Sequence, residues 1–244
     1  MTDIFDIHTH VLPGIDDGAE SIEEAMQMLK LAGEQGITEV IATPHYSHYS
    51  RFFQRLSPDE IRKLCTKLQR KMEESYGVQI KIWPGQEIFY TDNVVHKLEK
   101  KELLTMADSS YVLLEFYPSV AYSDLFRVVR KMVVERYRPI LAHVERYDVL
   151  QDSYKIEELT EQGAYIQMNF RLLGGKWSEK RTRWCRKLLK EEKVHFLGTD
   201  MHNTKRRKPE AKAAVDWMRR HLDEDYIDRV LRGNAEKILK DEKV

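Results

Sequence analysis

The stretch DIHTHVLPGIDDG at residues 6–18 brings together four side chains that can bind a metal ion, His8, His10, Asp16 and Asp17. His8 and His10 are two residues apart, so in a strand their imidazoles point to the same side and can chelate one ion. A polar turn after a short strand is the simpler explanation of the same residues. The rest of the chain decides between these two interpretations.

With His8 and His10 included, residues that can bind metals lie at or near the ends of six of the seven strands that the sequence predicts. In a barrel these strand ends converge on one face, where active sites are built. A carboxylate inside the apolar run YVLLEF, Glu115, is costly to bury unless it is paired or binds a metal. Histidine and carboxylate ligands without cysteine suit zinc, manganese or iron, and so many candidates indicate two or three ions. The candidates are His8, His10, His45, Glu87, Glu115, His143, Asp200 and His202.

The elements that carry these residues alternate along the chain. Short apolar runs bounded by turn residues are typical of buried parallel strands, and amphipathic segments typical of helices lie between them. This alternation predicts an α/β fold with a parallel sheet. Seven units without a Pro- or Gly-rich linker indicate one closed or nearly closed barrel, and a single domain over residues 1–244. The predicted strands span residues 4–7, 38–43, 79–85, 111–116, 138–144, 164–170 and 194–199.

Two of the predicted helices have clear end signals. In the helix over residues 21–36, Ser21 can act as the N-cap, Glu24 can complete a capping box, and Gly36 can end the helix. The helix over residues 57–77 has a serine cap, a proline at its first position and a glycine at its end. Four further helices are predicted over residues 122–136, 154–163, 178–193 and 209–221.

The composition argues against several classes of protein. Lys and Arg total 40, as do Asp and Glu, and this zero net charge weighs against a general nucleic-acid-binding protein, although KRRK at 205–208 is a local basic patch. Cys65 and Cys185 lie outside any CxxC pair, so a disulfide framework is not expected. The first residues do not resemble a secretory signal, and no apolar run approaches the ~20 residues that span a bilayer. We expect a cytoplasmic protein without membrane insertion.

The candidate chemistry is hydrolysis assisted by metal ions. The sequence contains no GxSxG, GxxxxGK[ST] or GxGxxG motif, and neither cysteine precedes a glycine-bearing phosphate loop. Clustered divalent ions lower the pKa of a bound water toward ~7 and stabilise the attacking and leaving oxygens of an in-line displacement. Phosphate esters are therefore the expected substrates. Arginine side chains form paired hydrogen bonds with phosphate oxygens. Arg146 follows His143 by three residues. Arg206 and Arg207 follow His202, and we favour Arg207 as the phosphate contact.

Six motifs occur in order along the chain: DIHTHVLPGIDDGA, IATPHY, GQEI, LLEF, LAHVERY and GTDMHN. Together they resemble the PHP (polymerase and histidinol phosphatase) superfamily, and more specifically its bacterial manganese-dependent tyrosine-protein phosphatases. The resemblance extends from residue 6 to about residue 240, and HVERY and GQEI favour the tyrosine phosphatase branch. It implies a distorted, TIM-like (β/α)7 barrel with a trinuclear metal centre. Manganese is the implied metal, and iron and zinc are alternatives.

The same resemblance implies individual roles. Of the two adjacent aspartates, Asp17 matches the family ligand and Asp16 is its non-ligating neighbour. The loop over residues 46–57 matches no family pattern that we can place, and HNTKRRKP is more basic than the family pattern. The implied metal ligands are His8, His10, Asp17, His45, Glu87, Glu115, His143, Asp200 and His202, and the implied phosphate-contacting residues are Arg146 and Arg207.

The resemblance therefore implies a metal-dependent protein-tyrosine phosphatase. A metal-activated hydroxide would attack phosphorus directly, without a phosphoenzyme, while Arg146 and Arg207 hold the phosphoryl oxygens. The proton for the leaving tyrosine would come from Asp200, His202 or a metal-bound water. The implied partner is an autophosphorylated bacterial tyrosine kinase that regulates capsule or exopolysaccharide synthesis.

Three alternatives stay open. The first keeps the chemistry but acts on histidinol phosphate or another small phosphomonoester. The second is a PHP-type exonuclease, against which the zero net charge and the lack of an attached polymerase region weigh. The third is a metal-bound scaffold for the kinase, which the complete ligand set disfavours. A homo-oligomer is compatible with each of them.

Overall fold

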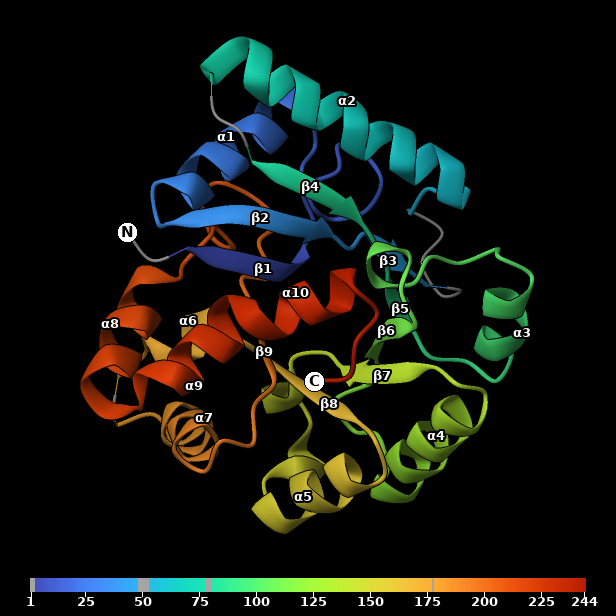
Figure 1. Cartoon of the computed structure of the whole chain (residues 1–244), viewed down its shortest axis with the longest axis vertical. Helices are drawn as coiled ribbons and strands as arrows, with labels where there is room; N and C mark the ends of the chain where they lie inside the picture. Colours follow the sequence, from blue (N-terminus) through green and yellow to red (C-terminus); the bar gives the residue numbers. More distant parts are fainter. Residues whose placement is uncertain (1–2, 48–52, 78–79, 177) are drawn as a thin grey trace.

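Parallel strands curl around an apolar core, and most of the helices lie outside them (Figure 1). The structure is a computed structural model that describes residues 3–47, 53–77, 80–176 and 178–244. One sheet has the strand order β1-β2-β4, with β1 at Ile4–Thr9, β2 at Ile37–Ala42 and β4 at Lys81–Pro84. The second has the order β3-β5-β6-β7-β8-β9. Its strands are β3 at His45–Tyr46, β5 at Glu87–Phe89, β6 at Tyr111–Glu115, β7 at Arg138–Leu141, β8 at Tyr165–Asn169 and β9 at Phe196–Gly198.

The predicted parallel α/β architecture is confirmed, but the expected count of seven strands differs from the structure. Each predicted run contains a strand, and β3 and β5 are additional short strands that the sequence did not reveal. Only two residues separate β3 from β2, and only two separate β5 from β4. The breaks occur at Pro44, which has no backbone N–H to donate, and at Gly85, where an added Cβ would lie 2.7 Å from Ile41.

The first and last strands lie side by side, and this brings the two ends of the chain to one site. The backbone N–H of Asp200 donates to the carbonyl of His8 at 2.9 Å, and that of His10 donates to the carbonyl of Met201 at 3.0 Å. Thr9 and Met201 also form a parallel bridge. The segments that carry the HxH and DxH histidines are therefore neighbours.

The core has an inner and an outer part because successive side chains in a strand point to opposite faces. In β6, Tyr111 and Leu113 pack in the inner cluster, whereas Val112 and Leu114 pack toward the surrounding helices. Helix α10 (Asn234–Leu239) lies over the centre of the strands in Figure 1. Its apolar residue Ile238 is fully buried in the inner cluster. The inner core thus occupies one end of the curled sheet and leaves the carboxyl ends of the strands for polar residues.

Helix α1 (Ile22–Gly33) begins where the sequence predicts and ends earlier. The Ser21 hydroxyl accepts from the backbone N–H of Glu24 at 3.2 Å. The Glu24 carboxylate accepts from the backbone N–H of Glu20 instead of Ser21, so the expected capping box is incomplete. The helix stops at Gly33, and Gly36 supplies a left-handed residue (φ 91°) in the following turn.

Helix α2 (Pro58–Tyr76) has the predicted serine cap, first-position proline and terminal glycine, and Gly77 adopts φ 61°. Its capping box is complete, because Ser57 and Glu60 each accept a backbone N–H from the other.

Within the described residues, no helix combines the length and the apolar character that a membrane span requires. The other α-helices are α3 (Val94–Glu99), α4 (Tyr122–Val134), α5 (Ser153–Glu161), α6 (Phe170–Leu173), α7 (Lys180–Lys190), α8 (Lys212–His221) and α9 (Glu224–Asp228).

Candidate metal centre

Nine histidine and carboxylate side chains converge at the carboxyl ends of the strands. They form four overlapping groups, and within each group one ligand atom per residue lies within 4.8 Å of all the others. All nine residues that the sequence singled out as candidate ligands take part, so the structure brings the whole set together. The groups are His10, Asp17, His45 and His202; His8, His10 and Asp200; His8, Glu87 and His143; and His45, Glu87 and Glu115.

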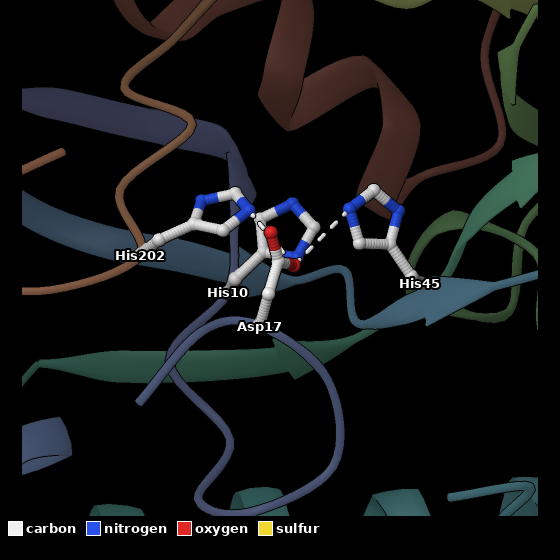
Figure 2. Close-up of side chains that lie close together, drawn as sticks. All are labelled: His10, Asp17, His45 and His202. Atoms are coloured by element: carbon white, nitrogen blue, oxygen red, sulfur yellow. Dashed lines mark ion pairs between the residues drawn. The ribbon is translucent and has the colours of Figure 1, made fainter. Parts of the chain in front are cut away.

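The first group draws on segments that are far apart in the chain (Figure 2). The Asp17 carboxylate points between two imidazoles, with its Oδ1 atom 3.3 Å from His202 Nε2 and 3.5 Å from His45 Nε2. The rings of His10 and His202 lie with their centroids 3.8 Å apart. The Asp17 side chain is half exposed, whereas those of His10 and His202 are buried. This group therefore lies at the opening of the cluster to solvent.

A buried carboxylate, Glu87, lies at the centre of the cluster. Its Oε2 atom is 3.1 Å from His8 Nε2, 3.2 Å from His10 Nε2 and 3.1 Å from His45 Nδ1. None of these contacts has hydrogen-bond geometry, so this buried oxygen has no hydrogen-bond partner among the described residues. Buried carboxylate oxygens are normally hydrogen-bonded or bound to a cation. Ring nitrogens that converge on one oxygen without hydrogen bonds fit ligands arranged around metal ions.

The outer nitrogens of two rings are held by acceptors. His202 Nδ1 lies 2.9 Å from the carbonyl of Asp200, and His10 Nδ1 lies 2.8 Å from the Asp16 carboxylate. Since both partners can only accept, each Nδ1 carries the hydrogen and each Nε2 faces the cluster. His10 Nε2 then lies 3.3 Å from His8 Nε2. Acceptors behind the imidazoles are typical of metal-binding histidines.

The electrostatics of the cluster favour positive charge. Burial alone would lower the pKa of His10, but the nearby carboxylates, first among them Asp16, raise it well above its ordinary value. Burial alone would raise the pKa of Glu87 and of Asp200, but the surrounding histidines hold both well below the ordinary range. The carboxylates are therefore ionised, and a cation is favoured where the ring nitrogens meet.

Asp16 differs from Asp17 in its surroundings. Its side chain is buried, and its Oδ2 atom accepts from His10 Nδ1 and, at 2.9 Å, from the backbone N–H of His45. Its Oδ1 atom accepts from the backbone N–H of Gly18 at 2.9 Å. Burial would raise the pKa of Asp16, yet His10 and these donors lower it well below its ordinary value. Asp16 thus orients the ring of His10 and holds the backbone of His45.

Glycine is required where this loop turns back onto the first strand. A Cβ added at Gly18 would lie 2.2 Å from the carbonyl oxygen and 2.6 Å from the Cβ of His10. The loop can therefore place Asp16 against the His10 ring only with glycine at this position.

Two residues of the cluster adopt a left-handed backbone. His143 follows β7 with φ 32°, and Asp200 follows β9 with φ 52°. Residues other than glycine rarely adopt this conformation, and such strain concentrates at functional sites. At both positions the chain leaves its strand sharply, and the side chain lies among the other candidate ligands.

Two amide side chains that sequence reasoning missed support the cluster from β8. The Gln167 carbonyl oxygen accepts from the backbone N–H of His143 at 2.6 Å and lies 3.2 Å from His8 Nδ1. The Gln167 amide group donates to Asn169, whose own amide group donates to Asp200 at 3.0 Å. The signal was present in AYIQMNF, because two polar residues alternate with apolar ones in a buried strand.

Asp6 is a third residue that sequence reasoning missed, and it fastens the first strand to the last. Its carboxylate accepts from the backbone N–H of His8, and from the backbone N–H and hydroxyl of Thr199 at 3.0 and 2.6 Å. Burial raises the pKa of Asp6 to about 6, although these hydrogen bonds oppose the shift. Asp6 is fully buried and positions His8 without belonging to any of the four ligand groups.

The two candidate phosphate-binding arginines meet at Asp200. Arg146 donates to one oxygen of this carboxylate, and Arg207 donates to the other at 2.9 Å. Arg207 also lies 3.4 Å from Asp17. Both guanidinium groups are about one-third exposed, so they lie between the buried cluster and solvent. Arg206, the other candidate for this contact, is exposed, and among the described residues its guanidinium group forms no hydrogen bond or ion pair.

The other histidines that the structure describes lie outside the candidate cluster. His96 is exposed on α3, and His221 stacks on Trp217 in α8. His195 accepts the backbone N–H of Ile166 at 3.1 Å. In the loop over residues 46–57, residues 48–52 lie outside the described residues. Phe53, in the described part of that loop, stacks on the His45 ring at 5.4 Å.

The chain resembles known proteins over nearly its full length. It is 29% identical to the tyrosine-protein phosphatase CpsB of Streptococcus pneumoniae over 246 residues, which covers 98% of this chain and 99% of the relative. It is 33% identical to the putative tyrosine-protein phosphatase CapC of Staphylococcus aureus over 205 residues, covering 81% of this chain and 76% of the relative.

Solved structures show the same fold. A crystal structure from work on YwqE of Bacillus subtilis and CpsB of Streptococcus pneumoniae, described as unique metal-dependent tyrosine phosphatases, superposes with a TM-score of 0.88. It is 28% identical, and the match covers 99% of this chain and 96% of that one. The phosphotriesterase homology protein of Escherichia coli, at 11% identity, shares the fold with a TM-score of 0.61 over 98% of this chain and 99% of that one. The model of the capsular polysaccharide synthesis family CpsB/CapC matches residues 4–240. This chain is therefore a member of the CpsB/CapC family.

Proposed function

We propose that this protein is a metal-dependent protein-tyrosine phosphatase that hydrolyses phosphotyrosine in proteins. The observation that carries the proposal is the convergence of nine metal-binding side chains beside two partly exposed arginines. The relatives named tyrosine-protein phosphatases, and the related structure described as metal-dependent, support the same activity.

We propose that the nine side chains hold two or three divalent ions. His8, His10, His45 and Glu87 each belong to two of the overlapping groups, and of these the Glu87 carboxylate has two oxygens with which to bind neighbouring ions. Histidine and carboxylate donors suit manganese, our first choice, and also iron or zinc. When bound, such ions lower the pKa of a water molecule toward ~7 and neutralise charge on a phosphate ester.

The arginines give the phosphoryl group its orientation in this proposal. Each oxygen of the Asp200 carboxylate accepts from one guanidinium group, so Asp200 sets the spacing between Arg146 and Arg207. Guanidinium groups form paired hydrogen bonds with phosphate oxygens, so a phosphate at the opening can be held from two sides. Asn169 donates to the same carboxylate, so every hydrogen-bond partner of Asp200 in this network is a donor. Asp200 is therefore a metal ligand and an anchor for both arginines. The proton for the leaving tyrosine comes from water, because His202 turns its unprotonated Nε2 toward the cluster and its Nδ1 hydrogen toward the carbonyl of Asp200.

The remaining expectations follow from this proposal. We propose an autophosphorylated bacterial tyrosine kinase of capsule or exopolysaccharide synthesis as the partner, and the cytoplasm as the location. We propose that β2 with β3 and β4 with β5 are interrupted strands of one seven-stranded barrel. We propose that this barrel forms a single domain over residues 1–244.

A single substitution in the cluster tests the proposal. The protein loaded with Mn²⁺ should release phosphate from a phosphotyrosine peptide. His143→Ala should lower kcat/KM by at least about 1,000-fold, because it removes a proposed metal ligand from the group that contains Glu87. His96→Ala, on the exposed face of α3, is the matched control and should retain full activity. Unchanged turnover in His143→Ala, with the same metal content, would contradict the proposal.

A further inference from the structure

A pair of aromatic rings, one half-buried and one exposed, lies beside the candidate metal centre. The rings of Phe89, at the end of β5, and Tyr117, after β6, meet edge to face with centroids 4.6 Å apart. Tyr117 is 54% exposed. We refer to Phe89 and Tyr117 as the aromatic rim.

Strand geometry places the aromatic rim on the side of the metal ligands. In β5, Glu87 lies in the cluster and Ile88 packs in the outer core, so Phe89 points to the same side as Glu87. Phe89 pairs in register with Glu115 of β6, and Tyr117 follows Glu115 by two residues. Both rings therefore start next to a candidate ligand.

The loop that carries Tyr117 is also tied to the segment that carries Arg146. The backbone N–H of Phe116 donates to the Tyr147 hydroxyl at 3.1 Å, and that of Asp148 donates to the carbonyl of Pro118 at 3.4 Å. Arg146 itself lies 4.0 Å from Glu115. The guanidinium group, the carboxylate and the aromatic rim thus occupy one side of the opening.

We propose that the aromatic rim binds the phenyl ring of the substrate and makes the centre selective for aryl over alkyl phosphates. This inference rests on the proposed phosphatase function and deepens it. In an aryl phosphate one oxygen joins the ring to phosphorus, so a phosphate held by Arg146 places the ring next to the groups that flank that arginine. Edge-to-face and offset contacts between aromatic rings are favourable beyond the area they bury, whereas an alkyl chain cannot form them.

The test compares phenylphosphonate with methylphosphonate, which carry the same acidic group and are not cleaved. Calorimetric titration of the Mn²⁺-loaded full chain should show about tenfold tighter binding of phenylphosphonate, the factor expected for one or two ring contacts. Tyr117→Ala should reduce that preference to about twofold without changing the affinity for methylphosphonate. Tyr117→Phe should retain the preference, and Phe89→Leu should weaken it.

Tyr76→Ala is the matched control, because Tyr76 is 41% exposed but lies at the end of α2 that leads into β4, opposite the carboxyl ends of the strands. Equal affinities for the two phosphonates in the wild-type protein would overturn the proposal. An unchanged preference in both Tyr117→Ala and Phe89→Leu would also overturn it. So would an equal loss of affinity for phenylphosphonate and methylphosphonate in these variants. A wild-type protein that prefers phenylphosphonate but does not hydrolyse a phosphotyrosine peptide would instead contradict the proposed function.

Discussion

Asp16 and Asp17 are adjacent in the chain, yet their surroundings give them different roles. The Asp16 carboxylate accepts three hydrogen bonds, from His10, His45 and Gly18, whereas Asp17 is half exposed and faces His45 and His202. We therefore expect Asp17→Ala to lose about one bound ion per chain at saturating Mn²⁺.

Asp16→Ala should instead keep the full metal content and bind metal about 10- to 100-fold more weakly, the usual effect of removing a residue that orients a ligand. Elemental analysis after dialysis at saturating and at limiting Mn²⁺ separates the two outcomes. Identical losses in the two variants would show that the distinction between the aspartates is wrong.

The adjacent arginines Arg206 and Arg207 also have different surroundings and different expected roles. Arg207 contacts Asp17 and Asp200, whereas Arg206 is exposed. Because a lost donor to transition-state charge costs about 100- to 1,000-fold in rate, Arg207→Ala should lower kcat/KM for a phosphotyrosine peptide by about 100-fold. Arg206→Ala should stay within about twofold. A larger effect in Arg206→Ala would transfer the phosphate contact to that residue.

At this scale the sequence was most informative where a residue has distinctive chemistry. Histidines and acids at strand ends could be listed from the sequence alone, and the structure brings that set together. Gln167, Asn169 and Asp6 were not predicted. Their function depends on which backbone groups and rings they meet across the sheet, and those partners lie up to 193 residues away in the chain.

Among the elements, β8 and β9 are joined by a histidine that titrates. The backbone N–H of His195 donates to the carbonyl of Ile166 at 3.0 Å, and its Nδ1 atom accepts the N–H of the same residue. Burial against Tyr165 disfavours the charged ring and lowers the pKa of His195 to about 4. Between pH 6.5 and 4 the unfolded chain therefore binds a proton that the folded chain does not, and stability falls as the pH falls.

This linkage predicts a difference between two proteins. On going from about pH 7.5 to about pH 5, the wild-type free energy of unfolding should decrease by about 2 kcal/mol more than that of His195→Asn, since each pH unit below the unfolded pKa contributes about 1.4 kcal/mol. Asparagine offers an oxygen to the Ile166 N–H but does not titrate. Urea unfolding curves at the two pH values measure the difference, and parallel pH dependences would refute the assignment.

Elements were predictable where a long segment imposes its own pattern. Helices α1 and α2 begin at their serine caps as expected. Strands β3 and β5 were missed because two- and three-residue strands are too short to show a period. They exist because Pro44 and Gly85 redirect the chain toward the next neighbour, and this shift places His45 and Glu87 side by side in register.

The whole molecule explains why residues from every part of the chain act together. Contacts between the first and last strands bring His8 and His10 to Asp200, and the inner core with α10 occupies the opposite end of the curled sheet. The alternation of strands and helices was sufficient to predict this convergence, because parallel strands place their carboxyl ends together. The number of strands was not predictable, since it depends on where each ladder breaks.

The central claim is that this centre hydrolyses phosphotyrosine rather than a related phosphate ester. Its most direct test is to measure kcat/KM of the Mn²⁺-loaded protein for a phosphotyrosine peptide, histidinol phosphate and single-stranded DNA under one set of conditions. We predict that the phosphotyrosine peptide is preferred over histidinol phosphate by at least about tenfold and that DNA is not cleaved. A preference of about tenfold or more for histidinol phosphate, or cleavage of DNA as the main reaction, would contradict the account.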